Sequence, residues 1–260
     1  MGTLYLVATP IGNLEDLSPR AQRTLRSAAL IAAEDTRHTR KLLTHFDIHT
    51  RLISYHEHNK LSRLDLVLAA LQTGDVALVS DAGTPALNDP GYELVRAALQ
   101  AGYPVSPIPG PSAPVAALVA SGLPTDTFLY LGYLPRKSSE RRRLLGEVRA
   151  LSHTLIFLES PHRLLEALAD LQQALGDRPA AVARELTKLY EEIFRGTLSQ
   201  AAAHFTAHPP KGEFTLVIGG EKAAPAAWDE PQLDQAIDQA LAEGQSAAQI
   251  AARLAEVSGW

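Results

Sequence analysis

Five short segments are rich in polar or charged residues, in glycine and proline, or in both, and each directly follows a predicted strand. They are Thr9-Pro-Ile-Gly-Asn, Glu34-Asp-Thr-Arg-His, His56-Glu-His-Asn, Ser80-Asp-Ala-Gly-Thr-Pro and Pro109-Gly-Pro-Ser-Ala. Carboxylates and imidazoles can accept protons, glycine lets a backbone approach a ligand closely, and proline stiffens the loop that carries it. In an open parallel sheet, ligands bind beyond the carboxyl ends of the strands. We therefore expect the five segments to meet in one site at one edge of a sheet.

Several common sites are excluded by spacing. Neither Gly-x-Gly-x-x-Gly after the first strand nor Gly-Lys-Ser/Thr occurs, which argues against a pyrophosphate site and a Walker-type phosphate loop. Ser112 opens a small-residue helix and lacks the second glycine of a nucleophile elbow. His56 and His58 do not have the His-Glu-x-x-His spacing, so hydrogen bonding or substrate contact is favoured over a metal, and no metal site is predicted.

Glu34 and Asp35 follow one apolar strand and have two compatible interpretations. One of the two carboxylates can point into the expected crevice. Asp35 can instead cap a helix predicted from Thr36 to Phe46, since carboxylates accept hydrogen bonds from free N–H groups at a helix start. The sequence leaves both roles open.

The elements that must position these loops alternate in two blocks. In the first block short aliphatic runs alternate with amphipathic stretches, which predicts a mainly parallel sheet, and Ser18-Pro19 marks one helix start. The turn-rich stretch from Ser121 to Asp126 divides the chain, and beyond it two strands are joined too tightly for a helical crossover, which predicts a mixed sheet. We predict domains at 1–121 and 122–221, followed by a linker and short helical tail at 222–260. The first-block strands are expected at 4–8, 30–33, 52–55, 76–79 and 105–108, and the second-block strands at 128–133, 154–158, 181–184, 192–195 and 214–218.

Composition limits the classes of protein. The 260 residues are 46% hydrophobic and 20% charged, enough for two globular domains. No run of about 18 apolar residues occurs, which predicts no membrane span, and the absence of cysteine excludes disulfides and thiol chemistry. We expect a cytoplasmic protein. The net charge of −5 disfavours general nucleic-acid affinity, but one cluster could be an RNA-facing patch or a solvated helix end: Arg136, Lys137, Arg141, Arg142 and Arg143.

Six motifs in order carry a family resemblance. They are Thr9-Pro-Ile-Gly-Asn-Leu-Glu-Asp, Ala32-Ala-Glu-Asp-Thr-Arg-His-Thr, His56-Glu-His-Asn, Ser80-Asp-Ala-Gly-Thr-Pro, Asn88-Asp-Pro-Gly-Tyr and Ala183-Arg-Glu-Leu-Thr-Lys. Over about residues 2–220 the chain closely resembles the ribosomal RNA small subunit methyltransferase I family of the tetrapyrrole-methylase (class III) superfamily. The resemblance implies an α/β fold of two domains, with S-adenosylmethionine bound between them, and a homodimer. Because that family commonly continues with a small helical extension, the tail is a candidate for a short or truncated terminus.

The resemblance also implies where the cofactor binds. The matching positions are Pro10, Ala82, Gly83, Thr84, Pro85, Leu87, Ser112, Ala113 and Leu186. Relatives that act on tetrapyrroles usually carry a glycine-rich loop where this chain has Pro10-Ile-Gly-Asn. This departure points to a different acceptor.

The reaction implied is methyl transfer to the 2′-oxygen of a cytidine in the decoding region of small-subunit RNA. A ribose hydroxyl is a weak acid, so a general base or a nearby cation would assist its attack. The catalytic candidates are Asp35, His56, Glu57 and Lys188; the substrate-binding candidates are Arg37, His58, Asn59, Arg136, Lys137 and Arg184. Because the chain is acidic, a small-subunit particle is a more plausible substrate than naked RNA. The alternatives are methylation of a tetrapyrrole precursor on the same scaffold and a metabolite-sensing module that binds without turnover.

Overall fold

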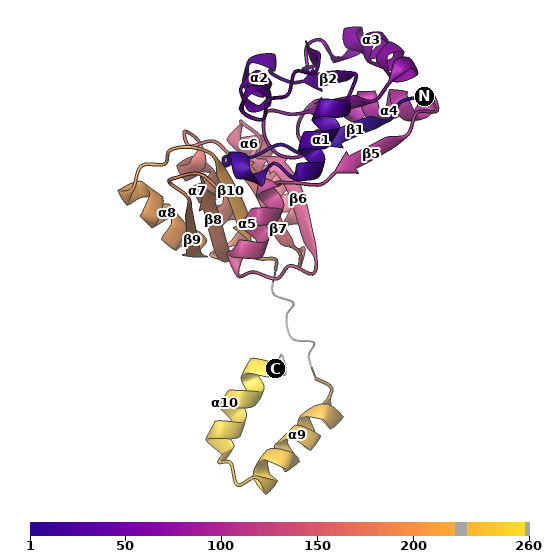
Figure 1. Cartoon of the computed structure of the whole chain (residues 1–260). Helices are drawn as coiled ribbons and strands as arrows, with labels where there is room; N and C mark the ends of the chain where they lie inside the picture. The colour runs from indigo at the N-terminus through magenta and orange to yellow at the C-terminus, as the bar shows by residue number, and fades with distance from the viewer. Residues whose placement is uncertain (222–227, 258–260) are drawn as a thin grey trace.

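The computed structural model describes residues 1–221 and 228–257 and contains two five-stranded sheets (Figure 1). All strands of the first sheet are parallel, in the order β3-β2-β4-β1-β5. Their bounds are β1 Leu4–Val7, β2 Leu30–Ala33, β3 Leu52–Ser54, β4 Val76–Val79 and β5 Val105–Ile108. The predicted parallel sheet is confirmed.

Helices cover both faces of this sheet. On one face lie α1 (Pro19–Ser27) and α2 (Thr36–His45), which bury Leu25 and Leu42 against the sheet. On the other face lie α3 (Lys60–Thr73) and α4 (Tyr92–Gln100), which bury Leu71 and Leu94. A short 3-10 helix, Leu14–Asp16, precedes α1 and was not predicted. Helix α1 begins where Ser18-Pro19 indicated, because the Ser18 side chain accepts a hydrogen bond from the backbone N–H of Ala21.

The second sheet is mixed, as the sequence predicted. Its order is β6-β7-β10-β8-β9, and only β6 and β7 pair in parallel. The bounds are β6 Phe128–Tyr133, β7 Thr154–Glu159, β8 Pro179–Arg184, β9 Glu192–Thr197 and β10 Phe214–Ile218. The tight connection seen in the sequence joins the antiparallel strands β8 and β9.

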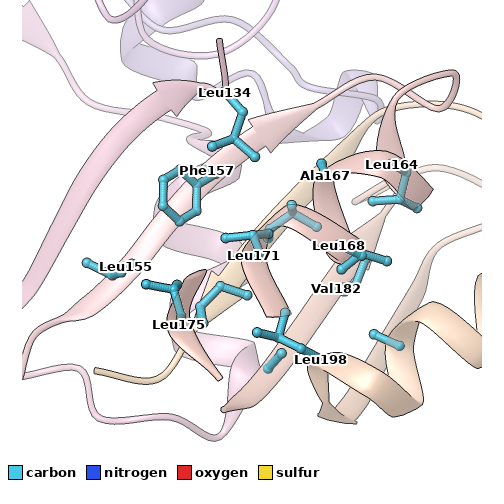
Figure 2. Packing of buried hydrophobic residues seen from close by; sticks show 14 of the residues in the cluster. Leu134, Leu155, Phe157, Leu164, Ala167, Leu168, Leu171, Leu175, Val182 and Leu198 are labelled. Atoms are coloured by element: carbon cyan, nitrogen blue, oxygen red, sulfur yellow. The ribbon is translucent and has the colours of Figure 1, made fainter. Parts of the chain in front are cut away.

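The main core of the second half lies between this sheet and α6 (Ser138–Val148), α7 (Leu164–Leu175) and α8 (Leu198–Ala207). Figure 2 shows Leu168 and Leu171 of α7 in one cluster with Phe157 of β7 and Val182 of β8. These side chains are completely buried, so removing them from water stabilises this half of the protein.

Helix α5 (Ala113–Ser121) packs on the opposite face of the second sheet, where Ala117 and Leu118 meet Ile156 and Val217. The sequence places this helix in the first domain, because the turn-rich stretch that predicts the boundary begins at Ser121. Its packing favours a domain boundary before α5, and the division of the chain into domains stays a proposal.

The basic cluster of α6 is smaller than the sequence indicated. Arg141 is only 1% exposed, and its guanidinium lies 2.6 Å from the Asp170 carboxylate of α7. It also donates to the carbonyl oxygens of Pro135 and Arg136. Arg141 therefore holds α6 against α7 and cannot contact RNA.

Beyond residue 227 the chain forms two helices, α9 (Glu230–Ala242) and α10 (Ala247–Val257), close to the predicted bounds. They pack on each other through Ala240, Ile250 and Leu254. Among the described residues, no helix is long and apolar enough to cross a membrane.

Candidate active site

The site lies where β1 and β4 end side by side. The chain leaves β1 through α1 on one face of the sheet and leaves β4 through α4 on the other face, which makes this edge a topological switch point. The two loops are tied together here, because Thr9 and Gly83 exchange backbone hydrogen bonds of 2.9 and 3.0 Å. Their backbones are therefore held in place before any ligand arrives.

A cavity of about 270 Å³, which we call the interface pocket, opens beside these loops and extends to the second sheet. It contains seven of the nine residues predicted to bind the cofactor: Ala82, Gly83, Thr84, Leu87, Ser112, Ala113 and Leu186. Pro10 instead lines a neighbouring cavity, and Pro85 lines neither. The structure thus brings most of these residues together, and their contact with a cofactor stays a prediction.

Unusual backbone conformations frame the pocket on both sides. Ala86 and Asn88, which flank Leu87, have φ of 67° and 64°, in the left-handed region. On the opposite wall Glu185 and Thr187, which flank Leu186, have φ of 50° and 65°. Such conformations cost about 1–2 kcal/mol each for residues other than glycine. In both loops this strained backbone directs a leucine to the pocket wall.

Glycine has a different role at each of two positions in the site. Gly83 has a φ of +78°, which glycine adopts without steric cost. At Gly12 an added Cβ would lie 2.3 Å from Cγ of Lys188 and 2.8 Å from the Thr187 hydroxyl. The loop after β1 can therefore touch the loop after β8 only because position 12 has no side chain.

The interface pocket is acidic. Glu34, Asp81, Asp89, Glu159 and Glu213 line it, and no lysine, arginine or histidine is among its described lining residues. Burial raises the pKa of Glu34, and the neighbouring Asp89 and Asp81 raise it further. Burial also raises the pKa of Asp89, with Asp81 adding to the effect. A cationic ligand would relieve this repulsion, whereas an anion would add to it.

Glu34 and Asp35 take different roles, one at the pocket and one at a helix start, both of which the sequence left open. Glu34 lines the pocket, while Asp35 caps α2 by accepting from the backbone N–H of Arg37 at 2.8 Å. Its other oxygen pairs with the Arg37 guanidinium at 2.7 Å. These hydrogen bonds hold the pKa of the Asp35 carboxyl well below its usual range, so Asp35 is a weak base.

The His56-Glu-His-Asn segment lies outside the interface pocket. Asn59 organises the turn, because its side-chain oxygen accepts from the His56 backbone N–H at 2.8 Å. Glu57 pairs with Lys60, and the rings of His56 and His58 meet edge to face at 6.0 Å. Nδ1 of His56 is buried without a hydrogen-bond partner among the described residues. None of the four touches the pocket wall, and their catalytic or substrate roles stay predictions.

Lys188 stands beside the pocket, with its ammonium 2.8 Å from Glu185 and 3.0 Å from Glu213, which is a lining residue. Burial alone would lower the pKa of Lys188, but these hydrogen bonds outweigh it and raise the pKa. Lys188 is thus a cation and a poor proton acceptor. Arg184 pairs with Glu192 at 3.0 Å.

Arg136 and Lys137 are exposed at the start of α6 and line neither cavity. Lys137 forms an ion pair with Glu140 at 3.4 Å. The two residues lie outside both linings, and their contact with RNA stays a prediction.

Several lining residues were not predicted as site residues. Asp81 and Asp89 lie within two of the quoted motifs, so their positions could have indicated them. Tyr130, Glu159 and Glu213 come from strands or loops of the second sheet that carry no motif. Burial raises the pKa of Tyr130 to about 12, so its phenol remains a hydrogen-bond donor at neutral pH.

Comparisons with known proteins agree with this architecture. The family profile Tetrapyrrole (Corrin/Porphyrin) Methylases matches residues 3–202. Proteins named ribosomal RNA small subunit methyltransferase I are 52% identical in both Synechocystis and Halalkalibacterium halodurans, covering 98% and 94% of this chain and 93% and 86% of theirs.

A solved structure titled uroporphyrin-III C-methyl transferase from Thermus thermophilus, complexed with S-adenyl homocysteine, has a TM-score of 0.57 and 21% identity. The match covers 85% of this chain and 98% of that one, which shows a common fold. The chain therefore belongs to the tetrapyrrole (corrin/porphyrin) methylase family, in the branch of ribosomal RNA small subunit methyltransferase I.

Proposed function

We propose that this protein is an S-adenosylmethionine-dependent methyltransferase that modifies small-subunit ribosomal RNA, at the 2′-oxygen of a cytidine in the decoding region. The observation that carries the proposal is an acidic pocket at the switch point of a chain 52% identical to named ribosomal RNA methyltransferases. The identity supports RNA as acceptor, and the pocket supports the methyl donor.

The residues of the interface pocket fit this donor. S-adenosylmethionine carries a sulfonium and an ammonium group, and a lining with Glu34, Asp81 and Asp89 favours positive charge. Gly83 offers its backbone at close range, while Leu87 and Leu186 provide apolar surface from opposite walls. Bound there, the donor supplies a methyl group on a good leaving group: the S–C bond breaks as the O–C bond forms, and the hydroxyl proton leaves.

The protein must orient the ribose and receive that proton. Among the carboxylates at this edge, Glu34 is a better proton acceptor than Asp35, because its pKa is raised whereas that of Asp35 is lowered. His56 and Glu57 stay candidates that would need to approach from the neighbouring turn. Lys188, as a cation, fits stabilisation of the developing negative charge on oxygen. Alignment against an activated methyl group supplies a large share of such a rate enhancement.

The test is methyl transfer from radiolabelled S-adenosylmethionine to purified small subunits that lack the modification, with mass mapping of the product RNA. We expect one ribose-methylated cytidine in the decoding region. Label in a base or at another nucleotide would refute the finer assignment. Binding of the donor without any labelled RNA, together with labelling of a uroporphyrinogen substrate, would replace the proposal with the tetrapyrrole alternative.

We also propose that the protein acts in the cytoplasm, where its ribosomal substrate is assembled, and as a homodimer. Light scattering coupled to size-exclusion chromatography measures the mass of the particle in solution. A mass of one chain, 28.0 kDa, at working concentration would contradict the dimer.

A further inference from the structure

A second cavity, of about 230 Å³, lies beside the interface pocket, and we call it the α2 pocket. Its walls come from the loop after β1, from α2 and from the loop after β4, and include Leu14, His38, Thr39 and Lys41. Asp81 lines both cavities, so they share a wall. A group held in the α2 pocket would lie next to a methyl donor in the interface pocket.

Thr39 gives this cavity an unsatisfied polar group. The residue is 2% exposed, and its hydroxyl has no hydrogen-bond partner within the described part of the chain. Buried hydroxyls are nearly always hydrogen-bonded, because leaving one unpaired forfeits its hydration. Thr39 lines the α2 pocket, so a ligand bound there could supply the hydrogen bond that the hydroxyl lacks.

Helix α2, which lines this cavity, and α1, which covers the same face of the sheet, are strongly basic. Helices α1 and α2 contain six of the chain's 24 Lys and Arg residues and no Asp or Glu, in a protein of net charge −5. All six are exposed: Arg20, Arg23, Arg26, Arg37, Arg40 and Lys41. We call this surface the α1–α2 face.

The cations of the α1–α2 face are largely uncommitted. Arg26 links the helices by donating to the carbonyl oxygen of Phe46 at 2.7 Å, and Arg37 pairs with Asp35. No ion pair joins Arg20, Arg23, Arg40 or Lys41 to any residue that the structure describes. Unpaired, exposed cations on two neighbouring helices can neutralise the phosphates of a nucleic-acid backbone.

We propose that the α1–α2 face binds the backbone of a single-stranded RNA segment and that the α2 pocket receives the target nucleoside from it. This inference rests on the proposed function and assigns the acceptor to a separate cavity. The α2 pocket, at about 230 Å³, is the smaller of the two adjoining cavities, and its place beside the proposed donor site suits one nucleoside turned out of its strand. The His38 ring offers a stacking surface for the base, and the Thr39 hydroxyl a hydrogen bond.

The first experiment measures the affinity of the whole protein for a short, fluorescently labelled single-stranded RNA at several salt concentrations. The test variant is Arg23→Gln/Arg40→Gln, and the matched control is Arg51→Gln/Arg149→Gln, which removes the same charge from exposed positions outside the α1–α2 face and outside the basic cluster of α6. For single strands, each lost phosphate contact lowers the slope of log affinity against log salt concentration by about 0.7. Two lost contacts therefore lower that slope by about 1.4, which weakens binding about 25-fold near 0.1 M salt.

The control should bind RNA as the unmodified protein does, and both variants should keep their affinity for S-adenosylhomocysteine. Equal affinity of the Arg23→Gln/Arg40→Gln variant and the unmodified protein would overturn the proposal. So would a larger loss in the Arg51→Gln/Arg149→Gln control. This measurement does not require methyl transfer, so it decides the inference even if the proposed function fails.

The second experiment compares Thr39→Val with Thr44→Val, an exposed threonine on the same helix. Valine keeps the shape of threonine and removes the hydroxyl. Thr39→Val should lower kcat/KM for the RNA acceptor about threefold to tenfold, the effect of one hydrogen bond, without lowering thermal stability or donor affinity. An unchanged kcat/KM, or a loss equal to that of Thr44→Val, would contradict a nucleoside in the α2 pocket.

Discussion

Adding a side chain at Gly83 should block the methyl donor. Gly83 has a φ of +78°, and a Cβ there would lie 3.5 Å from Cγ2 of Ile11 and 3.7 Å from the carbonyl oxygen of Pro111. Both distances are ordinary van der Waals contacts, so the protein itself has room for the methyl group of alanine. The conformation costs about 1–2 kcal/mol, and the new atom stands among lining residues of the interface pocket.

Gly102→Ala is the matched control for Gly83→Ala. Gly102 has nearly the same φ, +80°, nothing lies within 4 Å of its added Cβ, and it lines neither cavity. Both variants should therefore lose about 1–2 kcal/mol of folding free energy. Only Gly83→Ala should also weaken S-adenosylhomocysteine binding, about 5- to 150-fold, from an overpacking cost of about 1–3 kcal/mol.

Isothermal titration calorimetry gives the affinity, and thermal unfolding gives the stability of each variant. Gly83→Val should bind still more weakly. Gly83→Asn, which tolerates the left-handed conformation, should keep the fold while filling the same space. If the Gly83 variants fold and bind S-adenosylhomocysteine as tightly as Gly102→Ala does, the donor does not occupy the interface pocket beside this loop.

Two further substitutions test the charges. Because burial and nearby acids raise the pKa of Glu34, the unfolded chain ionises first as pH rises, so folding loses stability above the ordinary carboxyl pKa. Glu34→Gln should thus be more stable than the unmodified protein at neutral pH and equally stable in acid, and it should bind S-adenosylmethionine more weakly. Thermal melting at several pH values measures the stability, and calorimetric titration measures the binding. A variant less stable than the unmodified protein at neutral pH would contradict the reasoning. Arg141→Leu should lower the free energy of unfolding by about 3–5 kcal/mol, because it leaves the Asp170 carboxylate buried without its cation. The double variant Arg141→Leu/Asp170→Leu should recover most of that loss, as measured by urea unfolding. An additive double variant would show that the pair is not coupled.

The elements themselves were largely predictable from local signals. The strand from Leu4 ends within one residue of its predicted end, and the first helix begins at Pro19 as predicted. Both boundaries could be predicted because hydrophobic periodicity and helix capping depend on a few neighbouring residues. The acidic motif residues Asp81 and Asp89 were also present in the quoted segments. Their grouping with Glu34 follows from parallel strands ending at one edge.

Contacts between distant segments were not predictable in the same way. Helix α5 has little amphipathic contrast, so nothing in its own residues indicated which sheet it would cover. Arg141 looked like an exposed cation because its neighbours Arg142 and Arg143 are exposed, and its burial depends on Asp170 of another helix. A long charged side chain can be buried wherever a partner from elsewhere in the chain meets it.

The sequence by itself determined the strands, the helices, the loops that carry polar residues, and the family to which the chain belongs. Only the tertiary structure decided that Glu34 faces the interface pocket while Asp35 caps a helix, and that Thr39 is buried without a partner. The types and spacing of residues determine local conformation, because the hydrogen bonds of a helix or its cap join residues only a few positions apart. Side-chain direction, burial and pKa depend on groups brought from far along the chain, such as Asp89 beside Glu34, and so arise only when the sheets and helices pack.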